Sequence, residues 1–597
     1  MSWQSESVTI PILIDFPLFP ERPRNPVDLD KILELVFGLV GGLGIFLLGM
    51  KNMSEGMQAV AGAGLRRMIA AVTTNRVLAT LVGMFVTCVI QSSSITTVMV
   101  VGFVNSGLMT LTQAIGVIMG ANIGTTITGW ILVLKVGKYG LPILGVSAFV
   151  YLFSKGDRWR YTSMAIMGIG MVFVGLELMK DACGTIEELP QFAEWFQAFR
   201  ADSLLGVLKC VLAGCVLTTL VQSSSATLGI TVALTSNGLI GFETAAALVM
   251  GENIGTTITA LLASIGANTN ARRAAYFHVL FNVIGVIWIT CIFYWYVDWI
   301  GWMINQWLSW TVEPGTTFRD AVVGADGEKT YPNASLAVVS AHSIFNIVNT
   351  LIFMPFVPLF DRLLTRLVPS REGEASTRLT DLDIRMLETP AMAIEQSRRE
   401  IRRMGETCHE MLLSLTELRN QDRPDKALAD RLKQREQLLD GMQDEIAAFV
   451  TGLLSGNVSH SLADEARGQL RMADEFESIS DYLTSLDKFD RKLRRDGHRF
   501  EVHQREGLDG LNRLVDSYVS AVNEALVKGA ATVMVDTEAV SKRIRQEIKQ
   551  LRRKHLEEIS GGLVPPTVTV AFLASLNAYG RVRDHAHNIA ETLSGEK

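Results

Sequence analysis

The chain has 597 residues, and residues 1–370 carry 21 Lys/Arg and 22 Asp/Glu, about 12% of positions, whereas residues 371–597 carry 34 and 39, about 32%. Because soluble proteins carry about 25% charged residues, the first part is too poor in charge to cover a surface in water, and the second is richer than average. The small net charge of −6 and the lack of Lys/Arg-rich blocks argue against a nucleic-acid partner.

The first 30 residues are predicted to be an N-terminal segment outside the folded domains. They lack the basic start of a signal peptide, and five prolines interrupt their apolar stretch. The six cysteines of the chain form no CxxC pair and mostly lie in apolar runs. They are therefore expected to be buried hydrophobic residues rather than metal ligands or disulfide partners.

Seven apolar segments are long enough to cross a bilayer core as helices, which takes about 20 residues. They lie near 32–50, 109–135, 139–154, 161–179, 240–265, 274–297 and 336–360. Two further apolar stretches, 77–105 and 203–236, are interrupted in the middle by Gln-Ser-Ser-Ser. Irregular backbone at membrane depth is tolerated only where protein or a water-filled cavity surrounds it. The two stretches are therefore predicted to be re-entrant helical hairpins.

The loops between these segments predict an orientation. Basic residues gather in 51–76, 155–160, 272–273 and 362–371, and all four fall on one face if both hairpins return to their own side. By the positive-inside rule this face is cytoplasmic. We expect a multi-pass protein of the cytoplasmic (inner) membrane, with the N-terminus outside and the charged C-terminal part in the cytoplasm.

From about residue 380 onward the pattern changes to long amphipathic helices with few Gly or Pro. Six helices are predicted, at 381–418, 425–455, 460–490, 504–528, 533–559 and 566–594, and they divide into two three-helix bundles. The predicted fold class is all-α, with a membrane domain over 31–367, a linker over 368–378 and a cytosolic domain over 379–597.

The membrane domain contains an internal repeat with an offset of 131 residues. Gln91–Ser94 matches Gln222–Ser225, and Met119–Thr128 matches Met250–Thr259. The first copy covers about 32–154, the second about 161–297, and the crossing 336–360 is additional. In the predicted topology the two hairpins open to opposite sides, which makes the repeats inverted, as in secondary transporters. The alternative is duplicated packing, in which Gly and Ser let helices approach closely.

The repeated motifs favour binding of an oxyanion together with a cation. A helix that restarts after each tetrad exposes backbone N–H groups and a partial positive charge, which suit phosphate or another oxyanion. Hydroxyl and amide groups, with carbonyls freed at breaks in the Asn-Ile-Gly-Thr-Thr segments, offer oxygen ligands to a hard cation such as Na⁺. The motifs contain no Lys or Arg, so the anion's charge has to be met by dipoles and bound cations.

Three further polar features of the membrane domain have more than one reading. Glu252 stands where the first copy has Ala121, and it is either a cation ligand or protonatable coupling group, or a carboxylate that reaches water at a helix end. His278 and Asn282, and again His342 and Asn346, form a repeated His-x-x-Phe-Asn pattern. Hydrogen bonding between helices is the favoured role of this pattern, and contact with the substrate is the alternative.

Paired Gln-Ser-Ser-Ser motifs, each followed by Gly-x-Asn-Ile-Gly-Thr-Thr, resemble the type II sodium–phosphate cotransporter family over about 32–360. The resemblance implies sodium-coupled movement of inorganic phosphate. Carried over by motif, it implies phosphate binding by Gln91, Ser92, Ser93, Ser94, Gln222, Ser223, Ser224 and Ser225. It implies sodium binding or its support by Thr96, Asn122, Thr125, Thr126, Thr227, Asn253, Thr256 and Thr257.

The C-terminal part resembles a PhoU-type regulatory domain, whose halves each carry a metal-associated Glu-x-x-x-Asp element. In the first half Glu477 and Asp481 fit this element, and the resemblance implies a divalent metal there. The second half departs from it, because Gly580 replaces the Glu and Arg583 stands where a small residue is usual. Phosphate-signalling proteins as partners of this domain, and a homo-oligomer, are further expectations.

The predicted function is sodium-coupled secondary transport of inorganic phosphate by alternating access, with a regulatory cytosolic domain. Two alternatives stay open, a membrane phosphate sensor without net transport, and a transporter of another oxyanion or with proton coupling through Glu252. An enzyme is not expected, because the sequence has no Ser-His-Asp ordering, P-loop or metal-hydrolase motif.

Overall fold

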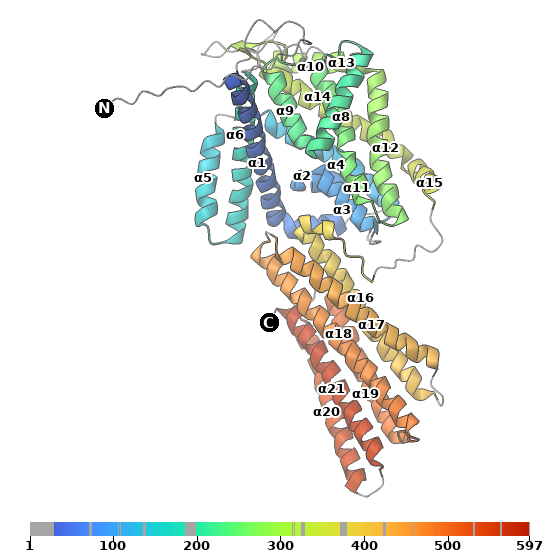
Figure 1. The fold of residues 1–597 in the computed structure, drawn as a ribbon. Helices are drawn as coiled ribbons and strands as arrows, with labels where there is room; N and C mark the ends of the chain where they lie inside the picture. Colours follow the sequence, from blue (N-terminus) through green and yellow to red (C-terminus); the bar gives the residue numbers. More distant parts are fainter. Residues whose placement is uncertain are drawn as a thin grey trace, which may run out of the picture.

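The computed structural model describes residues 29–595 apart from 71–74, 106, 108, 135–138, 185–198, 313–314, 316, 324–328, 370–378, 422–424, 457, 529–531 and 561–563. Most of the expected N-terminal segment 1–30 and linker 368–378 therefore lies outside the described residues. The chain forms a membrane region up to residue 369 and a helical region from 379, which lie end to end (Figure 1). One short antiparallel pair, β1 (Val322–Val323) and β2 (Lys329–Thr330), is the only sheet among the described residues.

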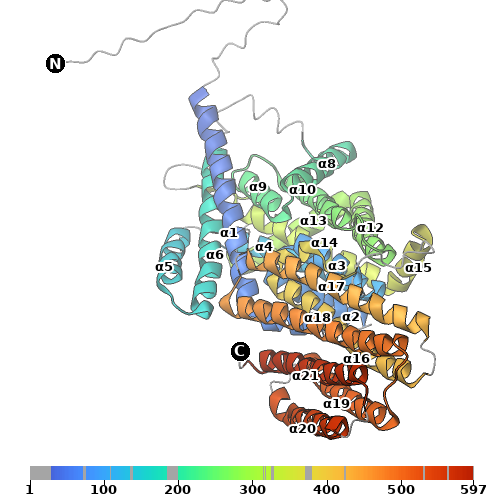
Figure 2. The ribbon, with the colours of Figure 1, turned by 60° about the horizontal axis from the view of Figure 1, so that its bottom comes forward.

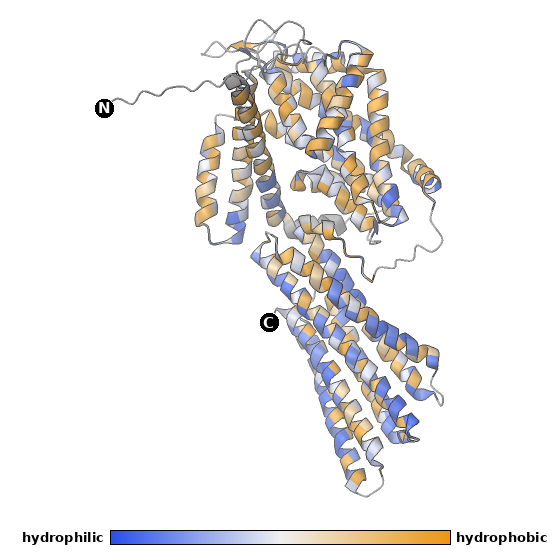
Figure 3. Ribbon diagram, viewed as in Figure 1, coloured by the Kyte–Doolittle hydropathy of each residue, from blue (hydrophilic) through white to orange (hydrophobic). Residues whose placement is uncertain are grey.

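The membrane region consists of α1 (Leu29–Ala70), α2 (Arg76–Ile90), α3 (Ser93–Asn105), α4 (Leu111–Leu132), α5 (Gly140–Phe153), α6 (Asp157–Gly184), α8 (Leu204–Val221), α9 (Ser224–Ser236), α10 (Phe242–Gly255), α11 (Thr257–Ala263), α12 (Thr269–Cys291), α13 (Phe293–Thr311), α14 (Pro332–Phe353), η3 (Met354–Phe356) and α15 (Val357–Leu367). Seven helical segments within the described residues are long and apolar enough to cross a membrane: 35–61, 111–132, 157–184, 204–221, 242–263, 269–291 and 333–367. In Figure 3 the helices of the membrane region consist mostly of hydrophobic residues, whereas hydrophilic residues are frequent in the helical region. The predicted all-α, multi-pass architecture is confirmed.

Several predicted boundaries were wrong. The segment 139–154 forms α5, whose 14 residues span only about 21 Å at 1.5 Å per residue, whereas α8 is long enough to cross. The stretch 51–76, predicted as a loop, continues α1 as far as Ala70, and this helix packs along α6. The segment 274–297 is divided at Ile292, where α12 ends and α13 begins.

Glycines bring the first helix of each hairpin against the helix that follows the hairpin. In the first copy, a Cβ at Gly83 would lie 2.1 Å from a carbonyl oxygen of α4, and one at Gly120 would lie 1.9 Å from a carbonyl oxygen of α2. In the second copy, Gly214 and Gly251 stand at the matching positions. A Cβ added to them would lie 2.0 and 1.9 Å from carbonyl oxygens of α10 and α8, respectively. The two copies therefore share one backbone contact, which any larger residue would force apart.

The matching turns of the two hairpins lie at opposite ends of the membrane region. After α3, the chain turns at Gly107 (φ +66°), where an added Cβ would lie 3.7 Å from the Arg399 guanidinium. After α9, it turns at Gly238 (φ +74°), packed against the ring of Tyr331. Arg399 belongs to the helical region, whereas Tyr331 precedes α14 at the far end of the membrane region (Figure 1).

The helical region consists of η4 (Ile384–Glu388), α16 (Pro390–Asn420), α17 (Lys426–Leu454), α18 (His460–Arg495), α19 (Val502–Lys528), α20 (Val533–Ser560) and α21 (Pro566–Ser594). All six predicted helices are present. The first begins at Pro390 rather than at 381, since proline fits the first turn of a helix but not its interior. The separate 3-10 helix η4 precedes it.

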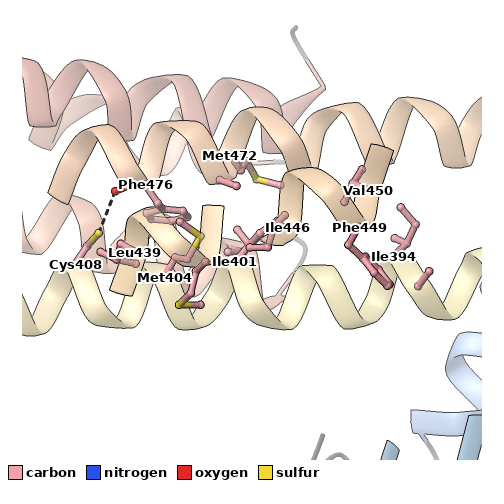
Figure 4. Close-up of a cluster of buried hydrophobic side chains, with 14 of the residues drawn as sticks. Ile394, Ile401, Met404, Cys408, Leu439, Ile446, Phe449, Val450, Met472 and Phe476 are labelled. Carbon is pink, nitrogen blue, oxygen red and sulfur yellow. Dashed lines mark hydrogen bonds between the residues drawn. The ribbon is translucent and has the colours of Figure 1, made fainter. Parts of the chain in front are cut away.

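The six helices form two bundles, α16–α18 and α19–α21, that lie side by side (Figure 2). Figure 4 shows the core of the first bundle, where the Cys408 thiol donates to the Phe476 carbonyl at 3.5 Å among buried aliphatic side chains. Between the bundles, Arg419 donates to Asp509 at 2.9 Å and to the Tyr579 hydroxyl at 2.8 Å. This buried ion pair joins α16 to α19 and α21, so the bundles form one unit.

The glycine contacts make a testable prediction about stability. Gly251→Ala places a methyl group against the α8 backbone, and overpacking of this kind costs about 1–3 kcal/mol or more. We expect a lower melting temperature for the detergent-purified protein than for Gly145→Ala, because nothing lies within 4 Å of an added Cβ at Gly145. Equal melting temperatures for the two variants would contradict the close contact.

Candidate functional site

Each Gln-Ser-Ser-Ser tetrad lies at a break between two helices. Gln91 ends α2 and Gln222 ends α8, and both adopt a left-handed conformation, with φ of +57° and +55°. They are the only non-glycine residues with positive φ in the part of the chain that the structure describes. Left-handed backbone costs a side-chain-bearing residue about 1–2 kcal/mol, so the matched pair is a conserved geometrical feature of the two copies. The predicted helix–break–helix hairpins are present.

Matched threonine pairs brace the two breaks. The Thr87 hydroxyl lies 3.1 Å from that of Thr96, and the Thr218 hydroxyl lies 3.0 Å from that of Thr227, so each pair joins the two helices of its hairpin. Thr96 and Thr227 also donate to the carbonyl of the first serine in their own tetrad. Both hydroxyls are fully buried. In this structure they hold the hairpin together rather than face an open site.

The first serine of each tetrad caps the helix that follows. Ser92 accepts from the N–H of Ile95, and Ser223 accepts from the N–H of Ala226, both at 3.2 Å. The N–H groups in the first turn of α3 and α9 are left without an intrahelical acceptor. The later serine hydroxyls, of Ser93, Ser94, Ser224 and Ser225, have no hydrogen-bond partner in the described ranges. Each break therefore presents unused donors beside a helix N-terminus.

The two glutamines differ in their contacts. The Gln91 amide donates to the Cys88 carbonyl at 2.6 Å and accepts from the Thr128 hydroxyl at 3.1 Å. Gln222 is exposed, and its side chain has no partner among the residues described here. The counterpart of Thr128 is Thr259, which donates to the Thr256 carbonyl of its own helix instead. The first glutamine is thus held in place, and the second is available to a ligand.

Both hairpins contact the end of α4 near their breaks. Thr128 holds the Gln91 amide, and at the next residue, Gly129, an added Cβ would lie 3.1 Å from Leu228 of α9. Leu228 follows the second tetrad by three residues, less than one turn. Two consecutive residues of α4 therefore contact Gln91 at the first break and the start of α9 just beyond the second break.

Helix α1 also contacts both hairpins. Ser54 donates to the Ile90 carbonyl, immediately before the first break. Phe46 packs on α9, where a Cβ at Gly229 would lie 3.1 Å from its ring. These two residues of α1 are eight positions apart, about 12 Å along the helix. These two contacts of α1, like those of α4, therefore place the two breaks close to each other.

The Asn-Ile-Gly-Thr-Thr segments were predicted to break their helices, and this is wrong for the first copy. Helix α4 runs without interruption from Leu111 to Leu132, whereas the second copy is interrupted at Thr256 between α10 and α11. In both copies the threonine hydroxyls donate to backbone carbonyls three or four residues earlier in the chain. Four hydroxyls do so: those of Thr125, Thr126, Thr256 and Thr257, at 2.7–3.0 Å.

The asparagines of these segments are buried in different surroundings. The Asn122 amide nitrogen has no hydrogen-bond partner in the described ranges. The Asn253 amide donates to the Val249 carbonyl at 3.1 Å, and its oxygen lies 3.4 Å from His342 Nε2. The structure thus brings His342, from the repeated His-x-x-Phe-Asn pattern, next to a predicted sodium ligand.

Glu252 is buried in α10, with 1% of its surface exposed, and its Oε2 has no partner among the described residues. The reading of this carboxylate as a group that reaches water is therefore wrong. His278 is equally buried, and neither of its ring nitrogens has a partner in the same part of the chain. Each Asn of the His-x-x-Phe-Asn patterns donates to the His carbonyl of its own helix. Only His342 makes the expected interhelical contact.

Several residues at the breaks were missed from the sequence. Thr87 and Thr218 match each other at the same offset of 131 as the tetrads, so the repeat itself could have identified them. Ser54 and Gln58 of α1, which form a hydrogen-bonded pair at 2.9 Å beside the first break, lie outside any repeated motif. Only the tertiary structure shows their role.

In the helical region, Glu477 and Asp481 lie together as predicted. Asp440 of α17 joins them, and one carboxylate oxygen from each residue lies within 4.8 Å of the others. Three carboxylates suit a hard divalent cation with water completing its coordination. In the second bundle, Gly580 has no side chain that could serve as a ligand, and the Arg583 guanidinium pairs with Asp584.

Two family models match the chain. Residues 45–181 and 191–300 match the Na⁺/Pi-cotransporter family, and residues 401–486 match the PhoU domain. The membrane region is therefore similar to the Na⁺/Pi-cotransporter family, a family of transporters, and the helical region is similar to the PhoU domain. This confirms the resemblance inferred from the tetrads. No solved structure matches the chain.

Curated relatives agree with this assignment. The chain is 28% identical over 65% of its length to a Salmonella typhimurium protein provisionally named inorganic phosphate export protein YjbB, and the match covers 66% of that protein, slightly less than two thirds. It is 28% identical to the uncharacterized Bacillus subtilis protein YqeW, over 55% of this chain and 96% of YqeW. A shorter match, 41% identical over 16% of this chain and 14% of the relative, is to human sodium-dependent phosphate transport protein 2B.

The acidic cluster makes a testable prediction about pH and metal. Burial, together with the neighbouring Asp481 carboxylate, raises the pKa of Glu477 and of Asp440 above their ordinary values. The folded state then holds protons more tightly than the unfolded state, so this contribution to stability falls as pH rises through the raised pKa values. Magnesium replaces those protons at high pH.

We therefore expect millimolar Mg²⁺ to raise the melting temperature of the helical region at pH 8 much more than at pH 5. Glu477→Gln should abolish most of the magnesium effect, and should raise the metal-free melting temperature at pH 8. Glu506→Gln, at an exposed position of α19, serves as the control. A wild-type protein without any magnesium effect at pH 8 would refute the metal site.

Proposed function

We propose that the chain transports inorganic phosphate across the cytoplasmic membrane, coupled to Na⁺ and by alternating access. The observation that carries the proposal is the pair of breaks at Gln91 and Gln222. Both have the same left-handed geometry, both precede a helix at whose start the later serine hydroxyls are unused, and both lie close to α4. Helix N-termini with free donors bind oxyanions, and two of them can hold phosphate from opposite sides.

The tetrads are assigned to phosphate, with Gln91, Ser92, Ser93 and Ser94 on one side and Gln222, Ser223, Ser224 and Ser225 on the other. The sodium ligands or their supports are assigned to Thr96, Asn122, Thr125 and Thr126, with Thr227, Asn253, Thr256 and Thr257 in the second copy. The threonine hydroxyls of the Asn-Ile-Gly-Thr-Thr segments support this division, because they donate to carbonyls three or four residues earlier in the chain and keep their lone pairs for a cation.

Alternating access requires repeats of opposite orientation. The position of the turns at Gly107 and Gly238, at opposite ends of the membrane region, supports inverted repeats. The same site serves uptake or export, since the gradients decide the direction of net movement. The name of the YjbB relatives favours export for those proteins.

The helical region is proposed to lie in the cytoplasm and to regulate transport. Two of the basic loops support this orientation, because they lie at the end of the membrane region that faces it. Asp157, in the loop 155–160, accepts from the backbone N–H of His460 at 3.1 Å. Arg273 donates to the Val368 carbonyl, where the chain leaves the membrane region, at 2.7 Å. By the positive-inside rule this end is cytoplasmic.

The site assignment is tested by Gln91→Gly and Gln222→Gly. Glycine adopts positive φ without strain, so each substitution removes the amide while relaxing the backbone. We expect sodium-dependent phosphate flux into proteoliposomes to fall at least about tenfold, the effect of losing about 1.4 kcal/mol of binding, with the melting temperature unchanged or raised. Ser147→Ala, in α5, is the control.

Unchanged flux in both glutamine variants would refute the site. Saturable binding of phosphate to the wild-type protein without any flux would favour the sensor alternative instead.

Proton coupling through Glu252 is a second candidate, favoured by the burial of this carboxylate and its unpartnered Oε2. If it applies, replacing Na⁺ with choline leaves phosphate flux dependent on pH, and Glu252→Gln removes that dependence. Flux that disappears in choline at every pH, and a Glu252→Gln variant with wild-type sodium dependence, would exclude it.

A further inference from the structure

The helical region contacts the end of the first hairpin through a notch at Gly102 of α3. A Cβ placed on Gly102 would lie 2.1 Å from the terminal methyl of Met386 and 3.8 Å from the Asp383 carboxylate. Met386 belongs to η4 and is 1% exposed, although η4 itself lies at the edge of the helical region. The Met386 side chain therefore occupies the space that any side chain at position 102 would fill.

The internal repeat shows that the hairpin does not itself require this glycine. At the matching position of the second hairpin stands Ala233, buried in α9. Glycine within a helix costs about 0.5–1 kcal/mol relative to alanine. The glycine therefore occurs only in the copy whose end faces the helical region, where it accommodates Met386.

Helix η4 is rigidly joined to the bundle behind it. The buried Gln396 of α16 accepts from the N–H of Asp383 at 3.2 Å and donates to the Asp381 carbonyl at 2.8 Å. Thr380 donates to the Glu445 carboxylate of α17. A displacement of α16 or α17 is therefore transmitted to η4, and through Met386 to α3.

A second connection leads from the helical region through α1 to the residue before the first break. A cavity of about 210 Å³ lies between the regions, lined by Gln58 of α1 and by Leu387, Pro390 and Ala391 next to η4. Gln58 donates to the Ser54 hydroxyl, and Ser54 donates to the Ile90 carbonyl, one residue before Gln91. The segment 386–391 thus adjoins the first hairpin at its end and, through α1, at its break.

We propose that η4 restrains the first hairpin, with Met386 as the wedge and Gly102 as its notch, so that the helical region limits the rate of transport by holding one hairpin and leaving the other free. The consequence for rate rests on the proposed phosphate transport, but the restraint itself does not. Met386 is a positioning residue, since it acts on α3 and touches no part of the tetrads.

Measurements of phosphate flux in the full-length protein test whether the restraint limits the rate of transport. Met386→Ala empties the notch, and Gly102→Ala expels the methionine from it, so both variants should increase sodium-dependent phosphate flux at least about fivefold, the lower end of measured couplings between sites. Ile384→Ala, which truncates a 74%-exposed side chain of the same short helix, should leave flux at the wild-type level. Adding Gly102→Ala to Met386→Ala should have no further effect, because the methionine is already absent.

Hydrogen exchange tests the restraint without relying on transport. Met386→Ala should accelerate amide exchange in α3 (residues 96–105) and leave α9 (residues 227–236) unchanged relative to Ile384→Ala. Equal exchange in α3 for both variants would overturn the restraint. Accelerated exchange in α3 with flux that is unchanged or lowered would overturn its role in transport. A wild-type protein without phosphate flux would instead refute the proposed function and leave the exchange result to decide the restraint.

Discussion

A chain that interrupts a helix inside a membrane has to find a partner for every backbone group that the interruption frees. This constraint explains the composition of the two breaks. The left-handed Gln91 and Gln222 end one helix while still closing its last turn, with backbone bonds of 2.7 Å to Thr87 and Thr218. The first serine caps the next helix, and the threonine pairs join the two. What stays unused is a small set of donors at each helix start, where an anion can complete the hydrogen bonding.

The same constraint explains why the copies share their packing but differ in their polar contacts. Contacts of the kind made by Gly120 and Gly251 fix the backbone of both copies alike, because a close-packed helix pair tolerates little change. Polar side chains in the space between the copies are not constrained in this way. Gln91 is held by Thr128 while Gln222 is unpaired, and Ala121 is replaced by Glu252. Two copies with matching backbone contacts thus carry different polar groups, which suits the proposed binding of an anion together with cations.

Much of this could be predicted from the sequence, because repeated motifs and apolar length are local signals. The tetrads, the offset of 131 residues and the six C-terminal helices were all predicted before the structure. Helix α5 was wrongly predicted to cross the membrane, and α8 was predicted only as part of a re-entrant hairpin although it is long enough to cross, because composition alone does not measure how far a helix extends. The sequence predicted a break at the Asn-Ile-Gly-Thr-Thr motif of α4, where the structure has a continuous helix. Whether such a motif interrupts its helix depends on the neighbouring helices, which the sequence does not show. Ser54, Phe46 and Met386 act through tertiary contacts between distant segments, for which the sequence carries no periodic signal.

Charge arithmetic indicates why such a site would need its cation. The two helix starts at the tetrads contribute about half a positive charge each, and the motifs contain no Lys or Arg. Phosphate near neutral pH carries about 1.5 negative charges, comparable to a phosphoryl group on a side chain. Dipoles alone therefore leave a deficit in a medium where an uncompensated charge is costly. A bound Na⁺ removes that deficit, and its carbonyl and hydroxyl ligands gain from the adjacent anion. In the proposed mechanism, affinity for each ion would then depend on the presence of the other, and this mutual dependence would couple their movement without any charged side chain that would hold the phosphate too tightly to release it.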